Sequence, residues 1–122
     1  MAIFTFLICT EPYKFEAVDS LINLSEAILK KGHKIQGIFF YGSGVYNIKK
    51  NKLAGDSMRN LPERLEKFCD KWNLVLTACS TWLSFTGIQS TELIEGACQK
   101  GLTALSEMIE NSDKLIVFGT GG

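Results

Sequence analysis

Cys79 is the residue whose type and position suit covalent chemistry best. It ends an apolar run, residues 74–78, and opens Ser80-Thr81-Trp82-Leu83, where a helix could begin. A thiol between a strand end and a helix start is placed where unpaired helix N–H groups and the positive end of the helix dipole favour the thiolate. In open α/β sheets this edge is also where ligands and substrates meet the protein. Position alone leaves open that Cys79 is a small buried hydrophobic residue.

The other three cysteines offer neither a metal site nor a disulfide framework. Cys9, Cys69 and Cys98 form no C-x-x-C pair, and the single histidine, His33, has no Cys or His at ligand spacing. The usual zinc patterns are therefore excluded, and in a reducing compartment disulfides are not expected. Cys69 falls inside the apolar stripe of a helix expected over residues 61–72, so we predict that it belongs to the core.

The balance of charge argues against binding to nucleic acid or to an anionic membrane. The chain has 122 residues, 46% of them hydrophobic, with 13 Lys and Arg against 13 Asp and Glu. A net charge of zero provides no global field for nucleic acid or an anionic membrane. The apolar start, residues 1–9, has no leading Lys or Arg and is too short for a signal sequence or a bilayer span. We therefore expect it to be a first strand, in a cytoplasmic protein.

Strand and helix patterns alternate along the chain. Continuous apolar runs predict buried strands over residues 3–9, 34–41, 73–78 and 114–118. Helical spacing of apolar residues predicts helices over 15–31 and 61–72, and helical material from about Thr91 to Ile109, interrupted by Gly96 and Gly101. A strand, a helix and a strand in succession imply parallel pairing with a right-handed crossover.

These elements predict an α/β fold, a three-layer sandwich. Its mostly parallel sheet would have about five strands, with helices on both faces. We expect one domain over residues 1–118 and a flexible tail over residues 119–122, which is glycine-rich.

Two further segments are weighed for function. Gly42-Ser43-Gly44 follows a strand but departs from the dinucleotide fingerprint, because the sixth position is Asn47 and no amphipathic helix follows directly. Residues 42–60 form the longest irregular stretch and are rich in lysine, so they are either a solvated loop or a docking surface. Trp82 and Phe85 are either core residues or an apolar wall for a partner.

Several stretches together resemble one known family. Residues 39–47, FFYGSGVYN, are similar to the FFY-x-x-GVYN segment of the DsrE/TusD sulfur-relay family, and Gly32-His33 resembles the Gly-His before it. Leu76-Thr77-Ala78-Cys79, followed by Gly87-Ile88, resembles the family's strand, its sulfur-carrying cysteine and a downstream glycine. Residues 101–114 resemble its last helix and strand, so the similarity covers nearly the whole chain.

The resemblance implies a DsrE-like fold and a sulfurtransferase without cofactor or metal. Cys79 would accept sulfane sulfur as a persulfide and pass it to an acceptor cysteine, for tRNA thiolation or for dissimilatory sulfur metabolism. Its partners would be sulfur donor and acceptor proteins with reactive cysteines, rather than nucleic acid or membrane. Like family members, the chain would form a homo-oligomer or a hetero-oligomer with related DsrE/F/H-like subunits.

Two alternatives remain beside this interpretation. The chain could be a non-catalytic binding subunit of a hetero-oligomeric sulfur-transfer complex. It could also be a thiol redox sensor in which Cys79 pairs with Cys9 or Cys98. Self-association is expected on separate grounds, because aromatic residues at strand ends and beside the loop are typical of interfaces: Phe39, Phe40, Tyr41, Tyr46, Trp82 and Phe85.

Overall fold

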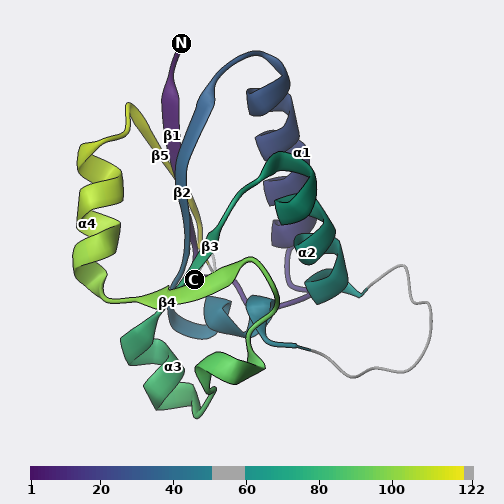
Figure 1. The fold of residues 1–122 in the computed structure, drawn as a ribbon, viewed down its shortest axis with the longest axis vertical. Coiled ribbons are helices and arrows are strands. Elements are labelled where there is room, and N and C mark those ends of the chain that lie inside the picture. Colours follow the sequence, from purple (N-terminus) through teal and green to yellow (C-terminus); the bar gives the residue numbers. More distant parts are fainter. Residues whose placement is uncertain (51–59, 120–122) are drawn as a thin grey trace.

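A parallel sheet forms the centre of the molecule (Figure 1). A computed structural model describes residues 1–50 and 60–119, and all elements named below lie within these ranges. The sheet there has five strands in the order β4-β3-β2-β1-β5, with every neighbouring pair parallel. The strands are β1 (Ile3–Ile8), β2 (Lys34–Phe40), β3 (Leu76–Cys79), β4 (Ala97–Lys100) and β5 (Lys114–Phe118).

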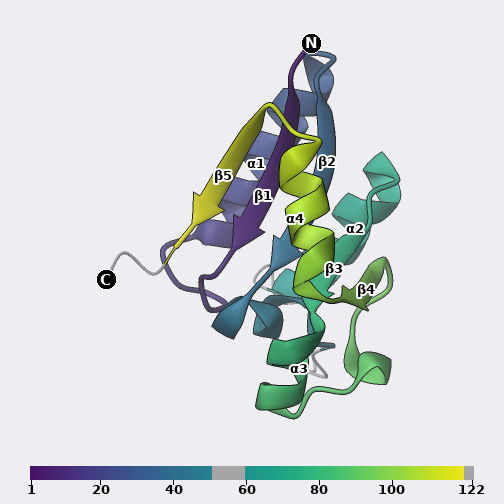
Figure 2. The ribbon, with the colours of Figure 1, turned by 90° about the vertical axis from the view of Figure 1, so that its left-hand side faces the viewer.

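Helices lie on both faces of this sheet. Figures 1 and 2 show α1 and α2 on one face and α4 on the other, while α3 lies beyond the carboxyl end of β3. The predicted three-layer α/β architecture is therefore confirmed. The helices are α1 (Ala17–Lys30), α2 (Leu61–Trp72), α3 (Ser80–Thr86) and α4 (Leu102–Glu110), and the 3-10 helices are η1 (Gly42–Ile48) and η2 (Ser90–Glu92).

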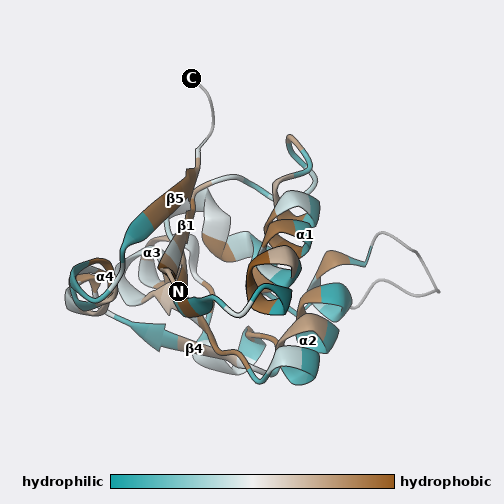
Figure 3. Ribbon diagram, turned by 90° about the horizontal axis from the view of Figure 1, so that it is seen from above, coloured by the Kyte–Doolittle hydropathy of each residue, from teal (hydrophilic) through white to brown (hydrophobic). Residues whose placement is uncertain are grey.

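The main core lies between the sheet and the helices α1 and α2. Alternate strand residues point to this side, including Phe6, Ile38, Phe40 and Leu76, all at most 1% exposed. Figure 3 shows hydrophobic residues of α1 on the side that faces the sheet. Burying each such side chain contributes about 1.5–3 kcal/mol, so this layer holds the strand ends in fixed positions.

The opposite face of the sheet is covered more thinly. No residue of α4 is buried, although the helix packs closely on β2, where a Cβ on Gly37 would lie 2.4 Å from the Met108 sulfur. On β5, Leu115 and Val117 are 41% and 51% exposed. Apolar side chains therefore remain open to solvent on the α4 side of the molecule.

One predicted element was wrong. The helical material expected from Thr91 is interrupted, because the short η2 is followed by the strand β4, which pairs with β3. Gly96 adopts φ +86°, a left-handed conformation that ends any helix there, and Gly101 precedes α4. The segment between these glycines is too short for a helix, and it instead completes the sheet at its edge.

Other predictions fall partly outside the described residues. The loop expected over residues 42–60 begins with η1, and residues 51–59 lie outside the described part of the chain. In the tail expected over 119–122, Gly119 accepts a hydrogen bond from the Thr10 hydroxyl at 2.9 Å, and residues 120–122 are not described. Among the described helices, none combines the length and apolarity that crossing a bilayer requires.

Candidate functional site

Cys79 lies at the junction that its sequence predicts. It is the last residue of β3 and the N-cap residue of α3, with φ −67° and ψ 117°. All four residues of β3 are buried, so the sheet fixes the backbone at this point. Since all strands run parallel, the junction lies at the carboxyl edge of the sheet, where α/β proteins bind their ligands.

The Cys79 side chain is nevertheless buried rather than exposed at that edge. Its residue exposure is 0%, so the surrounding chain covers the thiol completely. Within the described residues, no side-chain hydrogen bond caps α3, and Ser80 is its first helical residue rather than its cap. The strand-to-helix geometry is confirmed, while open access to the thiol is not.

Aromatic rings continue from the end of β2 across α3. The Tyr41 and Trp82 ring centroids are 5.7 Å apart, and those of Trp82 and Phe85 are 5.5 Å apart, both edge to face. Phe85 is 72% exposed at the end of this row. Phe39 and Phe40, by contrast, are fully buried and belong to the interior. The six aromatic residues predicted at an interface therefore fall into three groups. Phe39 and Phe40 are core residues, Tyr41, the partly buried Trp82 and Phe85 form the row, and Tyr46 is 43% exposed in η1.

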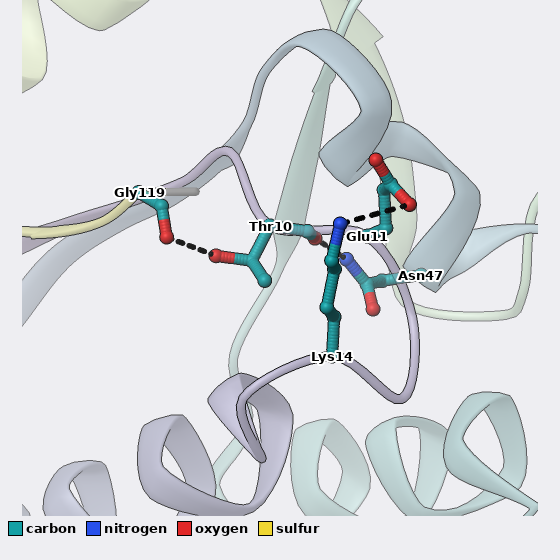
Figure 4. A network of polar contacts seen from close by, with 5 residues as sticks. All are labelled: Thr10, Glu11, Lys14, Asn47 and Gly119. Atoms are coloured by element: carbon teal, nitrogen blue, oxygen red, sulfur yellow. Dashed lines mark hydrogen bonds and ion pairs between the residues drawn. The ribbon is translucent and has the colours of Figure 1, made fainter. Parts of the chain in front are cut away.

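The segment of residues 39–47 that carries the family resemblance supports this edge of the sheet. Gly44 is required because a Cβ there would lie 2.1 Å from the carbonyl oxygen of Ile8. The Asn47 amide donates to the carbonyl oxygens of Thr10 and Gly44, each at 2.8 Å, as Figure 4 shows for Thr10. These contacts fix η1 against the end of β1, and η1 in turn contacts β3 and α3.

Two of the remaining thiols are poor candidates for a nucleophile. Burial, and then the Glu66 carboxylate, raise the pKa of the Cys69 thiol to about 11. Burial also raises the pKa of the Cys9 thiol. A higher pKa leaves less thiolate at neutral pH, and the thiolate is the reactive form. Cys69 lies within the core cluster, so the prediction that it is a core residue is confirmed.

A cavity elsewhere in the molecule has the wrong charge for anionic sulfur species. It has a volume of about 660 Å³ and is lined by Cys69 rather than Cys79. Four carboxylates surround it, those of Glu63, Glu66, Asp70 and Glu95, and one lysine accompanies them. The described residues contain no group of three or more His, Cys, Asp or Glu side chains that could hold a metal ion.

The sheet register brings Lys100 and Cys98 near Cys79; the sequence suggested Cys98 there only as a disulfide partner in a redox sensor, and it did not suggest Lys100. Strand β4 pairs Cys98 with Thr77 and Lys100 with Cys79. The error over residues 91–100 hid this arrangement, because a helix would have directed these side chains differently. The available signal was Gly96 and Gly101, which bound a segment of strand length.

The chain is similar to known proteins over most of its length. The model of a DsrE/DsrF-like family matches residues 2–118. The DsrE protein of Allochromatium vinosum is 28% identical over 119 residues, with 88% of this chain and 92% of the relative covered. A homologue of sulfurtransferase TusD from Pseudomonas aeruginosa is 28% identical, with 89% and 92% covered. The ychN protein of E. coli has a similar fold, with TM-score 0.80, 18% identity, and 97% and 100% of the two chains covered.

Proposed function

The chain belongs to the DsrE/DsrF-like family, and from this premise we propose that it is a sulfurtransferase carrying sulfur as a persulfide on Cys79. The observation that carries the proposal is the position of Cys79 between β3 and α3, at the carboxyl edge of a parallel sheet. Relatives that bear the name sulfurtransferase, such as the TusD homologue, support the same class of reaction.

The proposed chemistry needs only sulfur nucleophiles. The Cys79 thiolate attacks the outer sulfur of a persulfide on a donor protein, which forms a new S–S bond on Cys79 and releases the donor cysteine as a thiolate. An acceptor cysteine then attacks the same outer sulfur and releases Cys79. Each step exchanges one S–S bond for another, so no external oxidant or reductant takes part.

In this scheme the burial of Cys79 protects the persulfide, but it also restricts the access of a sulfur donor. A persulfide in a covered site is shielded from small thiols that would release its outer sulfur as hydrosulfide. Direct attack on a donor, however, requires that the Cys79 sulfur be reached, and in this conformation its exposure is 0%. We therefore expect that transfer depends on local opening, on partner docking, or on an intermediate carrier.

We also propose that the chain assembles with further copies of itself or with related DsrE-like subunits. Two exposed apolar surfaces support this: the aromatic row ending at Phe85, and the α4 side of the sheet, with Val117 51% exposed. Apolar surface of this kind marks interfaces. Sedimentation at micromolar concentration tests the assembly, because a clean monomer of 13.6 kDa that still takes up sulfur would contradict a role for assembly in building the site.

Intact mass spectrometry tests the proposed reaction. The protein is incubated with a persulfide donor, and we expect a mass gain of one sulfur that peptide mapping places on Cys79. Cys79→Ala should lose sulfur held at that position, while Cys69→Ala, a change at a core thiol of raised pKa, should keep it.

The outcome also separates the alternatives. No mass gain on the assembled protein would refute the proposal and favour a non-catalytic subunit. Formation of a reversible disulfide between Cys79 and Cys9 or Cys98, without stable sulfur uptake, would favour a redox sensor.

A further inference from the structure

Two thiols lie on one face of the sheet at its β4 edge. The register of β3 and β4 pairs Thr77 with Cys98 and Cys79 with Lys100. Residues paired across parallel strands point to the same face, and residues two apart in one strand do so as well. The Thr77 hydroxyl and the Cys98 sulfur lie 3.9 Å apart, which places their side chains together. Cys98 is therefore the diagonal neighbour of Cys79.

The two thiols differ in their access to solvent. Cys79 is 0% exposed, whereas Cys98 is only partly buried. Cys98 lies on β4, the outermost strand on this side of the sheet, and β3 with Cys79 is the next strand inward. Figure 2 shows β4 on the right-hand side of the view, below α2 and above the level of α3. A sulfur donor approaching this edge meets Cys98 before Cys79.

The spacing of the two cysteines suits a persulfide better than a disulfide. From a strand separation of about 4.8 Å and a rise of about 3.3 Å per residue, their Cα atoms are roughly 8 Å apart. A disulfide requires about 4.4–6.8 Å, so the two cysteines do not bridge without backbone movement. A persulfide extends the Cys98 side chain by one S–S bond of about 2 Å, toward the reach of the Cys79 sulfur.

We propose that Cys98 is the entry thiol, which takes sulfur from the donor and hands it to Cys79. This inference rests on the proposed persulfide function of Cys79. First, the Cys98 thiolate attacks the outer sulfur of the donor persulfide, a Cys98 S–S bond forms, and the donor cysteine leaves as a thiolate. Then the Cys79 thiolate attacks that same sulfur, so that the Cys98 S–S bond breaks and Cys98 returns to a thiolate. Sulfane sulfur moves inward with no net oxidation.

Lys100 supplies a positive charge near the proposed sulfur transfer from Cys98 to Cys79. It is paired with Cys79 in the register and is exposed, with a flexible four-carbon stem. Its positive charge therefore lies on the edge strand β4, two residues from Cys98, where an anionic persulfide donor would approach. In this relay, in which sulfur passes from Cys98 to Cys79, Cys98 and Lys100 of β4 each have a role. Direct transfer from the donor to Cys79 would require neither residue.

A time course of sulfur loading tests the relay. The protein is mixed with glutathione persulfide, quenched at intervals with an alkylating agent, and mapped by peptide mass spectrometry. In the unchanged protein, sulfur should appear on Cys98 before it appears on Cys79. In Cys79→Ala, sulfur should accumulate on Cys98. In Cys98→Ala, the rate of Cys79 loading should fall by roughly tenfold or more, because the covered thiol must then meet the donor directly.

Cys9→Ala is the matched control, because Cys9 is also a partly buried thiol that follows a strand, and its loading rate should equal that of the unchanged protein. Thermal unfolding of Cys98→Ala and Cys98→Ser shows whether the fold is kept. The order of labelling in the unchanged protein keeps the test valid even if neither variant folds. Loading of Cys79 before Cys98, or at an unchanged rate in Cys98→Ala, would overturn the relay and leave the function of Cys79 intact. Absence of sulfur on every thiol would instead overturn the proposed function itself.

Discussion

Replacing Asn47 with alanine should destabilise the protein by about 2–3 kcal/mol. The side chain is 1% exposed, and its amide donates two hydrogen bonds of 2.8 Å to backbone carbonyl oxygens. Each buried hydrogen bond contributes about 0.5–1.5 kcal/mol net, and the lost volume adds roughly 1 kcal/mol. Part of this is offset, because the Asn47 Oδ1 atom has no hydrogen-bond partner among the described residues and its removal relieves that cost.

Urea denaturation measures this change. With a slope of about 1.5 kcal/mol per molar urea, the midpoint should fall by roughly 1.3–2 M. Asn111→Ala is the matched control, because the Asn111 amide also donates to a carbonyl oxygen, that of Glu107, at 2.8 Å, but at an exposed position. We expect that control to cost about 0.5 kcal/mol or less. Equal midpoint shifts in the two variants would refute the argument that burial makes the Asn47 bonds important.

Two further predictions concern a close backbone approach and a buried thiol. Gly44→Ala should lower the free energy of unfolding by about 3 kcal/mol or prevent folding, because its Cβ would lie 2.1 Å from the Ile8 oxygen. Gly101→Ala is the control: its Cβ would meet open space and its φ is −77°, so the urea midpoint should change little. If both variants lost a comparable amount of stability, the short distance between Gly44 and the Ile8 oxygen would not be the reason that residue 44 must be glycine. Because the pKa of Cys69 is raised to about 11, its contribution to stability is complete below about pH 8.5, the unfolded pKa, and is lost as pH rises toward 11. Between these limits the unfolding free energy of the unchanged protein should fall more steeply with pH than that of Cys69→Ala, and parallel pH profiles would contradict this.

The sequence was a good guide to the elements with long apolar runs. Leu61–Trp72 and Lys114–Phe118 match the predicted helix and strand, because each has a continuous stripe or run and clear end signals. Cys79 was correctly placed at a strand end for the same reason. Strand β4 was missed because it is short, lies at the edge, and includes the polar residues Gln99 and Lys100. An edge strand of this kind is defined by its pairing with β3, and pairing over long sequence separation leaves little local signal.

The burial of Cys79 could not be predicted from the sequence either, because it depends on how several segments that are far apart in the sequence pack together. The FFYGSGVYN segment predicted the family, yet its Gly44 and Asn47 contact the backbone of Ile8 at the end of β1 and of Thr10 just after it, rather than the thiol.

The segment's influence on the site is therefore indirect. Asn47 and Gly44 fix η1 to β1, η1 contacts α3, and the first turn of α3 follows Cys79. A weakened Asn47 contact should loosen the cover of Cys79 as well as lower stability. If Cys98 is the entry thiol, such loosening would let the donor reach Cys79 directly and make loading less dependent on Cys98. If both proposals hold, the support of the sheet edge and the route of sulfur depend on one arrangement: the η1 contacts keep Cys79 covered, and Cys98 on the neighbouring strand receives the sulfur.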